Sequence, residues 1–181
     1  VSFLMESGVK MLLEELKKAM KRGAQVRILT GNYLGITQPS ALYLIKHELG
    51  ELVDLRFYNE KNRSFHPKSY IFHYADHSEI YIGSSNISRS ALTSGIEWNY
   101  RFSSHRDPEN YEKFYRTFED LFQNHSVVID DKELKRYSKT WHRPAASKDL
   151  DRYDNVEEEE DTKVRLLFEP RGAQIEALCS L

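Results

Sequence analysis

Apolar positions near the start of the chain recur with the spacing of a helix. From Val9 to Met20 they return every three or four residues, with Lys and Glu between them. Ser7 is a residue type that suits the N-cap of such a helix, and Gly23 suits its end. This pattern predicts one amphipathic helix close to the beginning of the sequence.

The segments that follow alternate between strand and helix. Short apolar runs typical of buried strands stand on either side of a second helical segment. We therefore expect the order strand, helix, strand, helix, strand over residues 1–4, 9–20, 25–30, 39–49 and 53–58. This alternation predicts an α/β fold with a mixed, largely parallel β-sheet flanked by helices, and such sheets bind ligands at the ends of their strands.

Two polar phrases mark the central stretch, residues 65–100. His66 and Lys68 belong to a predicted strand that starts at His66-Pro67-Lys68, and Ser84 and Asn86 close the next one. Residues two apart in a strand project from the same face, so each pair shares a face. If the two strands pair, an imidazole, an ammonium, a hydroxyl and an amide meet in one patch. Such a set suits an anionic tetrahedral group such as a phosphate.

A third predicted strand, over 95–102, completes this patch. Its alternation puts Glu97 and Asn99 on one face and the apolar side chains of Ile96, Trp98 and Tyr100 on the other. A helix over 107–123 follows, with a broad aromatic stripe that predicts packing against the sheet.

Composition and charge narrow the class of protein. The chain has 181 residues, 40% of them hydrophobic and 30% charged, and no apolar run approaches the roughly 20 residues that span a bilayer. It shows no secretory signal, and its one cysteine, Cys179, excludes an internal disulfide framework. These features lead us to expect a cytoplasmic protein that does not contact a membrane.

The charge is unevenly distributed, and it suggests three parts. Residues 149–181 carry ten acidic and four basic side chains, whereas residues 1–148 have a net charge of +4. We expect a domain over 1–130, a charged linker or arm over 131–165, and the start of a truncated further domain over 166–181. The chain would then be a piece of a longer protein. A mildly basic domain is compatible with a nucleic-acid partner.

The pattern His66-x-Lys68 followed by Gly83-Ser84-x-Asn86 resembles the signature of the phospholipase D superfamily. The segment Glu97-Trp98-Asn99 resembles the acidic strand of its nuclease branch. The likeness covers most of residues 1–130. The family's usual Asp, five residues after the Lys, is replaced here by His73, which weakens the match to the lipid-cleaving members more than to the nucleases.

The chemistry of these side chains agrees with what the resemblance implies. Lys68 would neutralise phosphate charge, with Ser84 and Asn86 as directional donors. His66 is the one group in the patch suited to act as a nucleophile near neutral pH without a metal, giving a phosphohistidine. Glu97 would hold the far ring nitrogen of His66. Arg89 and Asn99 are further candidates for substrate binding. An ordinary surface position is an equally good interpretation of Arg89. No metal or other cofactor is expected.

The resemblance also implies partners. Family members take a second imidazole from a second motif or from a twofold partner, and this chain has one motif, which implies a homodimer with a shared site. Residues 168–174 resemble the Gln-containing entry of superfamily 2 DEAD/DEAH-type helicases. Phospholipase D-like nucleases occur fused ahead of such helicases, so DNA is the expected substrate, and ATP would bind only through the missing C-terminal helicase region.

Alternative interpretations stay open at this point. The same fold could serve as a non-catalytic nucleic-acid-binding module of a helicase, or, with less support, as a phospholipid phosphodiesterase. His73, Asp76 and His77 form a candidate zinc cluster, but their spacing suits a helix, whereas the local pattern predicts a strand and a turn. We therefore expect no metal there.

Overall fold

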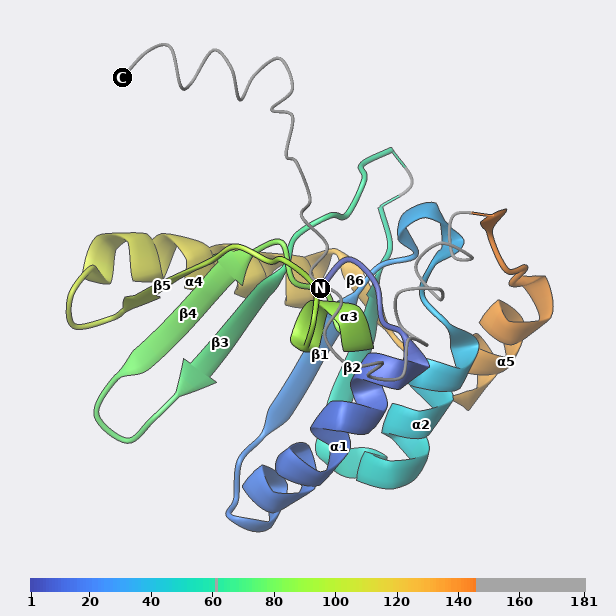
Figure 1. Ribbon diagram of the computed structural model, residues 1–181, viewed down its shortest axis with the longest axis horizontal. Coiled ribbons are helices and arrows are strands. Elements are labelled where there is room, and N and C mark those ends of the chain that lie inside the picture. The colour runs from blue at the N-terminus through green and yellow to red at the C-terminus, as the bar shows by residue number, and fades with distance from the viewer. Residues whose placement is uncertain (61, 146–181) are drawn as a thin grey trace.

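The computed structural model describes residues 1–60 and 62–145, which alternate between helices and strands (Figure 1). In chain order the elements are α1 (Glu6–Lys21), β1 (Val26–Thr30), the 3-10 helix η1 (Tyr33–Gly35), α2 (Pro39–Leu49), the 3-10 helix η2 (Gly50–Leu52), β2 (Val53–Tyr58), β3 (Ser69–His73), β4 (Ser78–Gly83), α3 (Arg89–Leu92), β5 (Asn99–Ser103), α4 (Pro108–Asn124), β6 (Ser126–Val128) and α5 (Asp131–Thr140).

The strands of the described residues form two three-stranded sheets, β1-β2-β6 and β3-β4-β5. The α/β class with mixed strand directions is therefore confirmed. Parallel pairing is less extensive than expected, because among these strands only β1 and β2 pair in parallel. The reason lies in the connections: four residues link β3 to β4, whereas a parallel pair needs a crossover of about a dozen or more.

An extended segment at the start of the chain joins the two sheets. Leu4 forms a parallel bridge with Ile87, and the Met5 N–H donates to the Ile87 carbonyl at 2.9 Å. On the other side of the segment, the Gln38 N–H donates to the Leu4 carbonyl at 2.9 Å. The strand expected over residues 1–4 is wrong, because the pairing is reduced to the single bridge at Leu4, and the segment brings the loop after β1 close to the end of β4.

Helices α1 and α2 pack beside each other and form the main hydrophobic core with β1 and β2 (Figure 1). Their buried side chains, Val9 and Leu13 of α1 and Leu42 and Ile45 of α2, lie at the helical spacing read from the sequence. Helix α4 contacts both sheets, through β5 and through β2 and β6. Its aromatic stripe is only partly buried, with Phe122 in the core and Phe114 exposed.

The expected N-cap of α1 is wrong. Ser7 is not the N-cap, because the helix begins at Glu6 after Met5, and Gln38 takes the capping part by accepting from the Glu6 N–H at 2.8 Å. Helix packing also continues past residue 130, the expected end of the domain. Helix α5, expected as linker, buries Leu134 against the main core, because an amphipathic helix can cover α2 despite its high charge. Residues 146–165 of the expected arm and the expected segment 166–181 lie outside the described residues.

Candidate functional site

The site residues gather where β3 begins and β4 ends. His66 and Lys68 lie just before β3, which begins at Ser69 and not at His66 as expected, and Ser84 and Asn86 follow β4 directly. The strand expected over 95–102 begins only at Asn99, so Glu97 precedes β5. The Gly83 N–H donates to the Lys68 carbonyl at 3.1 Å, which extends the β3–β4 pairing as far as the His-x-Lys phrase. Antiparallel pairing therefore places the start of one strand beside the end of the other, as the two phrases require.

Lys68 contacts the imidazole of His66 directly. The Lys68 Nζ lies 3.0 Å from Nδ1 and 2.8 Å from Nε2 of His66, and the Lys68 side chain is almost fully buried, with 9% exposure. Burial and, second, the Lys68 charge lower the pKa of His66 below its ordinary value. Burial also lowers the pKa of Lys68, against the opposing effect of Glu97. Both effects on His66 favour its neutral form, which is the form that a nucleophile needs.

Asn86 is buried and held by its carbonyl oxygen. The Ser2 hydroxyl donates to Asn86 Oδ1 at 2.7 Å, and the Phe3 N–H donates to the same atom at 3.3 Å. Both partners come from the extended segment that joins the two sheets, more than 80 residues away in the sequence. Because Oδ1 is engaged, the amide nitrogen is left as the free hydrogen-bonding end of the side chain, and we find no partner for it in 1–60 or 62–145.

Glu97 and Ser84 form a second hydrogen-bonded unit. The Ser84 hydroxyl donates to Glu97 Oε2, and the Trp98 N–H donates to Ser84 Oγ at 3.0 Å. The structure thus brings Glu97 to the site, but its contact is with Ser84, whereas the ring nitrogens of His66 contact Lys68. The expected contact between Glu97 and His66 is absent from the described residues. The reason is that the carboxylate finds a nearer donor at the end of β4.

Asn99 and Arg89 differ in how close they come to this unit. The Asn99 amide donates to Ser85 Oγ at 2.8 Å, so Asn99 lies beside the end of β4. Arg89 is exposed at the start of α3, and its backbone N–H donates to Ser7 Oγ at 3.3 Å. No contact joins the Arg89 side chain to His66, Lys68, Ser84 or Asn86 in the part of the chain that the structure describes.

Two tyrosines belong to the site although the sequence did not single them out. The ring of Tyr33, in η1, lies 4.2 Å from the His66 ring between centroids, at an interplanar angle of 47°. Tyr70 donates to the Ser85 carbonyl at 2.9 Å, and burial, with a smaller effect of Glu97, raises its pKa to about 12. The position of Tyr33 just after β1 was a usable signal, since ligand-binding residues of such sheets follow the strands.

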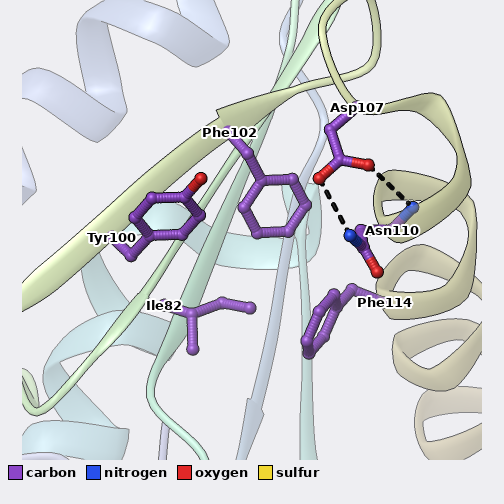
Figure 2. A pocket seen from close by; sticks show the side chains of 6 residues that line it. All are labelled: Ile82, Tyr100, Phe102, Asp107, Asn110 and Phe114. Atoms are coloured by element: carbon purple, nitrogen blue, oxygen red, sulfur yellow. Dashed lines mark hydrogen bonds between the residues drawn. The ribbon is translucent and has the colours of Figure 1, made fainter. Parts of the chain in front are cut away.

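Two hollows lie away from His66. One, of about 260 Å³, is lined by Ile82, Tyr100, Phe102, Asp107, Asn110 and Phe114 (Figure 2). Asp107 accepts there from both the backbone and the side chain of Asn110, capping α4. Because Ile82 precedes Gly83 in β4, this apolar hollow opens on the face of the sheet opposite to Gly83 and Asn99. It is therefore not part of the polar site.

The second hollow, of about 400 Å³, lies at the far end of the β3-β4-β5 sheet and is lined in part by His77, Glu79 and Arg101. His77 contacts Asp76 at 2.8 Å, while His73 contacts Ser78 at 2.9 Å. The two histidines thus have separate partners. In residues 1–60 and 62–145 no group of three His, Cys, Asp or Glu is arranged to hold a metal ion. No helix in the same residues is long and apolar enough to cross a membrane.

An imidazole, a buried ammonium and an amide nitrogen without a partner in the described residues lie together at paired strand ends, and such a set of groups suits an anionic ligand. Residues 2–125 match the family described as "Cardiolipin synthase, PLD-like domain". The match spans more than half of the sequence and includes every site residue named above, so the chain belongs to this phospholipase D-like family. Proteins with such domains are generally phosphodiesterases. A search of curated proteins found no match.

Proposed function

We propose that this chain is a metal-independent phosphodiesterase that cleaves DNA through a phosphohistidine intermediate. The observation that carries the proposal is the contact of the Lys68 ammonium with both ring nitrogens of His66. Nearly equal distances to both nitrogens place the ammonium over the face of the imidazole, because an in-plane position would overlap the carbon between them. The lone pair of the accepting nitrogen lies in the ring plane, so it can attack phosphorus while the ammonium binds a phosphate oxygen beside it.

The reaction then has two steps. The free nitrogen of His66 attacks phosphorus, a P–N bond forms, and the bond to the leaving oxygen breaks as that oxygen takes a proton from a second imidazole. Water next attacks phosphorus, transfers its proton to that second imidazole and breaks the P–N bond. Lys68 and the amide of Asn86 stabilise the negative charge on the non-bridging oxygens in both steps. Glu97 supports the site through Ser84 and through its charge near Lys68.

The second imidazole is proposed to come from His66 of a second copy of this chain. The sequence contains one His-x-Lys phrase followed by Gly-Ser-x-Asn, so the second group has no source within it. Exposed apolar side chains lie next to Glu97 and Asn99 along the chain: Ile96, Trp98 and Tyr100 are 63%, 82% and 69% exposed, and the Ser84 N–H donates to the Trp98 carbonyl. An apolar surface this close to an incomplete site supports contact with a twofold mate.

DNA is proposed as the substrate for two reasons. Glu97-Trp98-Asn99 resembles the acidic strand of nucleases, and residues 1–148 have a net positive charge of +4, which favours a polyanion. The likeness of residues 168–174 to helicases supports a module of a larger cytoplasmic nuclease-helicase, with any ATP bound by the helicase part.

The test is cleavage of labelled single- and double-stranded DNA in EDTA, run beside phospholipid vesicles containing cardiolipin. Wild type is expected to cleave DNA, and His66→Ala is expected to be inactive. His47→Ala, which removes an exposed histidine of α2, is the matched control and should cleave normally. DNA binding without cleavage would replace the proposal with a non-catalytic binding module, and cleavage of lipid alone would replace it with a phospholipid phosphodiesterase.

Sedimentation equilibrium tests the shared site. Wild type is expected to be a dimer, and Trp98→Ser is expected to shift it toward monomer while lowering cleavage in proportion. Leu52→Ser, which changes an exposed apolar residue in η2, is the control and should leave the dimer intact. A monomeric wild type that cleaves DNA at every concentration would refute the shared-site mechanism.

A further inference from the structure

Tyr33 is placed to govern the orientation of the His66 ring. The centroids of the two rings lie 4.2 Å apart, and the planes are tilted by 47°. Apart from this ring, the ring contacts of His66 in the described residues are those with Lys68. We propose that Tyr33 is a positioning residue for His66 and that α5 holds the loop carrying Tyr33 in place. This inference rests on the proposed role of His66 as the nucleophile.

The loop that carries Tyr33 has an unfavourable backbone. Leu34, directly after Tyr33, has a φ of 52°, and Gly35 has a φ of 73°. A leucine in the left-handed region is uncommon, since its Cβ crowds the following carbonyl. The loop's own bonds are short-range, from the Gly35 N–H to the Asn32 carbonyl and from the Ile36 N–H to the Tyr33 carbonyl. Such a conformation persists only where surrounding structure holds it.

Helix α5 and the residue after it supply that support. The Tyr137 hydroxyl lies 2.8 Å from Asn32 Oδ1 and 2.7 Å from the Thr37 carbonyl, and donates to one of them at a time. The Trp141 indole N–H donates to the Gly35 carbonyl at 2.7 Å. These contacts bracket Tyr33 on both sides along the chain and span about a hundred residues of sequence.

Tyr137 is itself packed against the main core. The Tyr137 ring packs 4.9 Å from the ring of Phe57, in β2, and burial raises the pKa of its hydroxyl above the ordinary value, so the hydroxyl stays a donor. Leu134, one turn earlier, is buried in the main core. The main core therefore holds α5, α5 holds the loop that carries Tyr33, and Tyr33 contacts the ring of His66. In-line attack on phosphorus depends on the orientation of that ring.

Steady-state kinetics on DNA in EDTA, with the full chain, test the role of Tyr33. Tyr33→Leu is expected to lower kcat about tenfold to a hundredfold with little change in KM, because a misdirected nucleophile still binds substrate. Tyr33→Phe keeps the ring and should stay close to wild type. Tyr43→Leu, an exposed tyrosine of α2, is the control. Equal loss in Tyr33→Phe, or a loss confined to KM, would overturn the proposal.

An NMR titration of the His66 ring gives a second readout that needs no turnover. Tyr33→Leu is expected to remove the ring-current shift of the His66 ring protons and to raise the His66 pKa toward its ordinary value, because the imidazole gains contact with water. Unchanged His66 shifts in Tyr33→Leu would overturn the proposal. If wild type cleaves no DNA while these shifts change as expected, the proposed function has failed and the ring contact stands.

The contribution of α5 is tested by Tyr137→Phe combined with Trp141→Phe, which removes the hydrogen bonds and keeps the aromatic rings. This pair is expected to lower kcat in the same direction as Tyr33→Leu, with Tyr43→Phe as the control. In the Tyr33→Leu background the pair should add little, since both act through one contact. Full additivity, or an unchanged kcat in the pair, would show that α5 does not act through Tyr33.

Discussion

The change Asn86→Asp tests the amide nitrogen of Asn86 separately from its oxygen. A carboxylate can keep the oxygen that accepts from Ser2 and from the Phe3 N–H. It cannot keep the amide donor, which becomes a negatively charged acceptor facing the substrate. If the proposed role of the amide is correct, this change of one atom and one charge removes phosphate binding while the tether stays in place.

The magnitude follows from the bond that is lost. A hydrogen bond to a charged group contributes about 1.5–3 kcal/mol, which corresponds to a roughly 10- to 150-fold weaker affinity for the phosphodiester. Repulsion between the new carboxylate and the phosphate adds to this loss. The carboxylate is also buried, because Asn86 is 6% exposed, so a lower melting temperature is expected as well.

The assay is the dissociation constant for DNA by fluorescence anisotropy in EDTA, at a temperature where circular dichroism shows every variant folded. Gln25→Glu makes the same change of charge on an exposed residue before β1 and is the control. Ser2→Ala supplies a second variant, since it leaves the amide but removes its tether. It should cost about 0.5–1.5 kcal/mol of stability, or a few degrees in Tm. Wild-type affinity in Asn86→Asp would refute the assignment of the amide as a phosphate donor.

Three further predictions follow from the same site. Gly83→Ala should lower the free energy of unfolding by about 1–3 kcal/mol, measured in urea, because an added Cβ would overlap the Trp98 carbonyl and the Asn99 side chain; wild-type stability would contradict this packing. Lys68→Met should raise the pKa of His66, followed by NMR, because a neighbouring positive charge is removed; a lower pKa would contradict it. In wild type the pKa of His66 is lower in the folded chain than in the unfolded chain. As the pH falls, the unfolded chain therefore binds this proton first, so His66 lowers the free energy of unfolding only at acidic pH. This destabilisation disappears as the pH rises. Glu97→Gln should lower the pKa of Lys68 further and reduce kcat with little loss of folding, and unchanged kinetics would exclude a role for this carboxylate.

Much of the fold was predictable, because it depends on neighbours in the sequence. The recurrence of apolar residues from Val9 to Met20 predicted α1, although Met11 of that series is exposed and Leu13 is buried instead, and the short apolar runs predicted β1 and β2. Pairing of the two strands beside His66 and Asn86 was a condition of the predicted patch, and the structure shows that pairing. The mixed directions of the sheet were underestimated, since parallel pairing was inferred from helix-strand order without weighing the length of each connection.

The sequence predicted which residues form the candidate site, but it predicted their contacts less well. His66, Lys68, Ser84, Asn86 and Glu97 were chosen from two phrases and a strand, and the structure brings the strand ends that carry them together. The proposed partner of Glu97 was His66, whereas its contact is Ser84. Alternation fixes the face on which a side chain lies but does not decide which of several nearby donors it meets.

The sequence by itself determined which chemistry this chain presents: one imidazole, one ammonium and one amide, in two phrases that border a pair of strands. Only the tertiary structure decided how those groups are held. Asn86 is oriented by Ser2, and His66 is contacted by Tyr33, whose loop is held by Tyr137 and Trp141 of a segment that its charge alone marked as a linker. Local periodicity carries no information about such partners, because they lie far apart in the chain and meet only after the two sheets and their helices have packed.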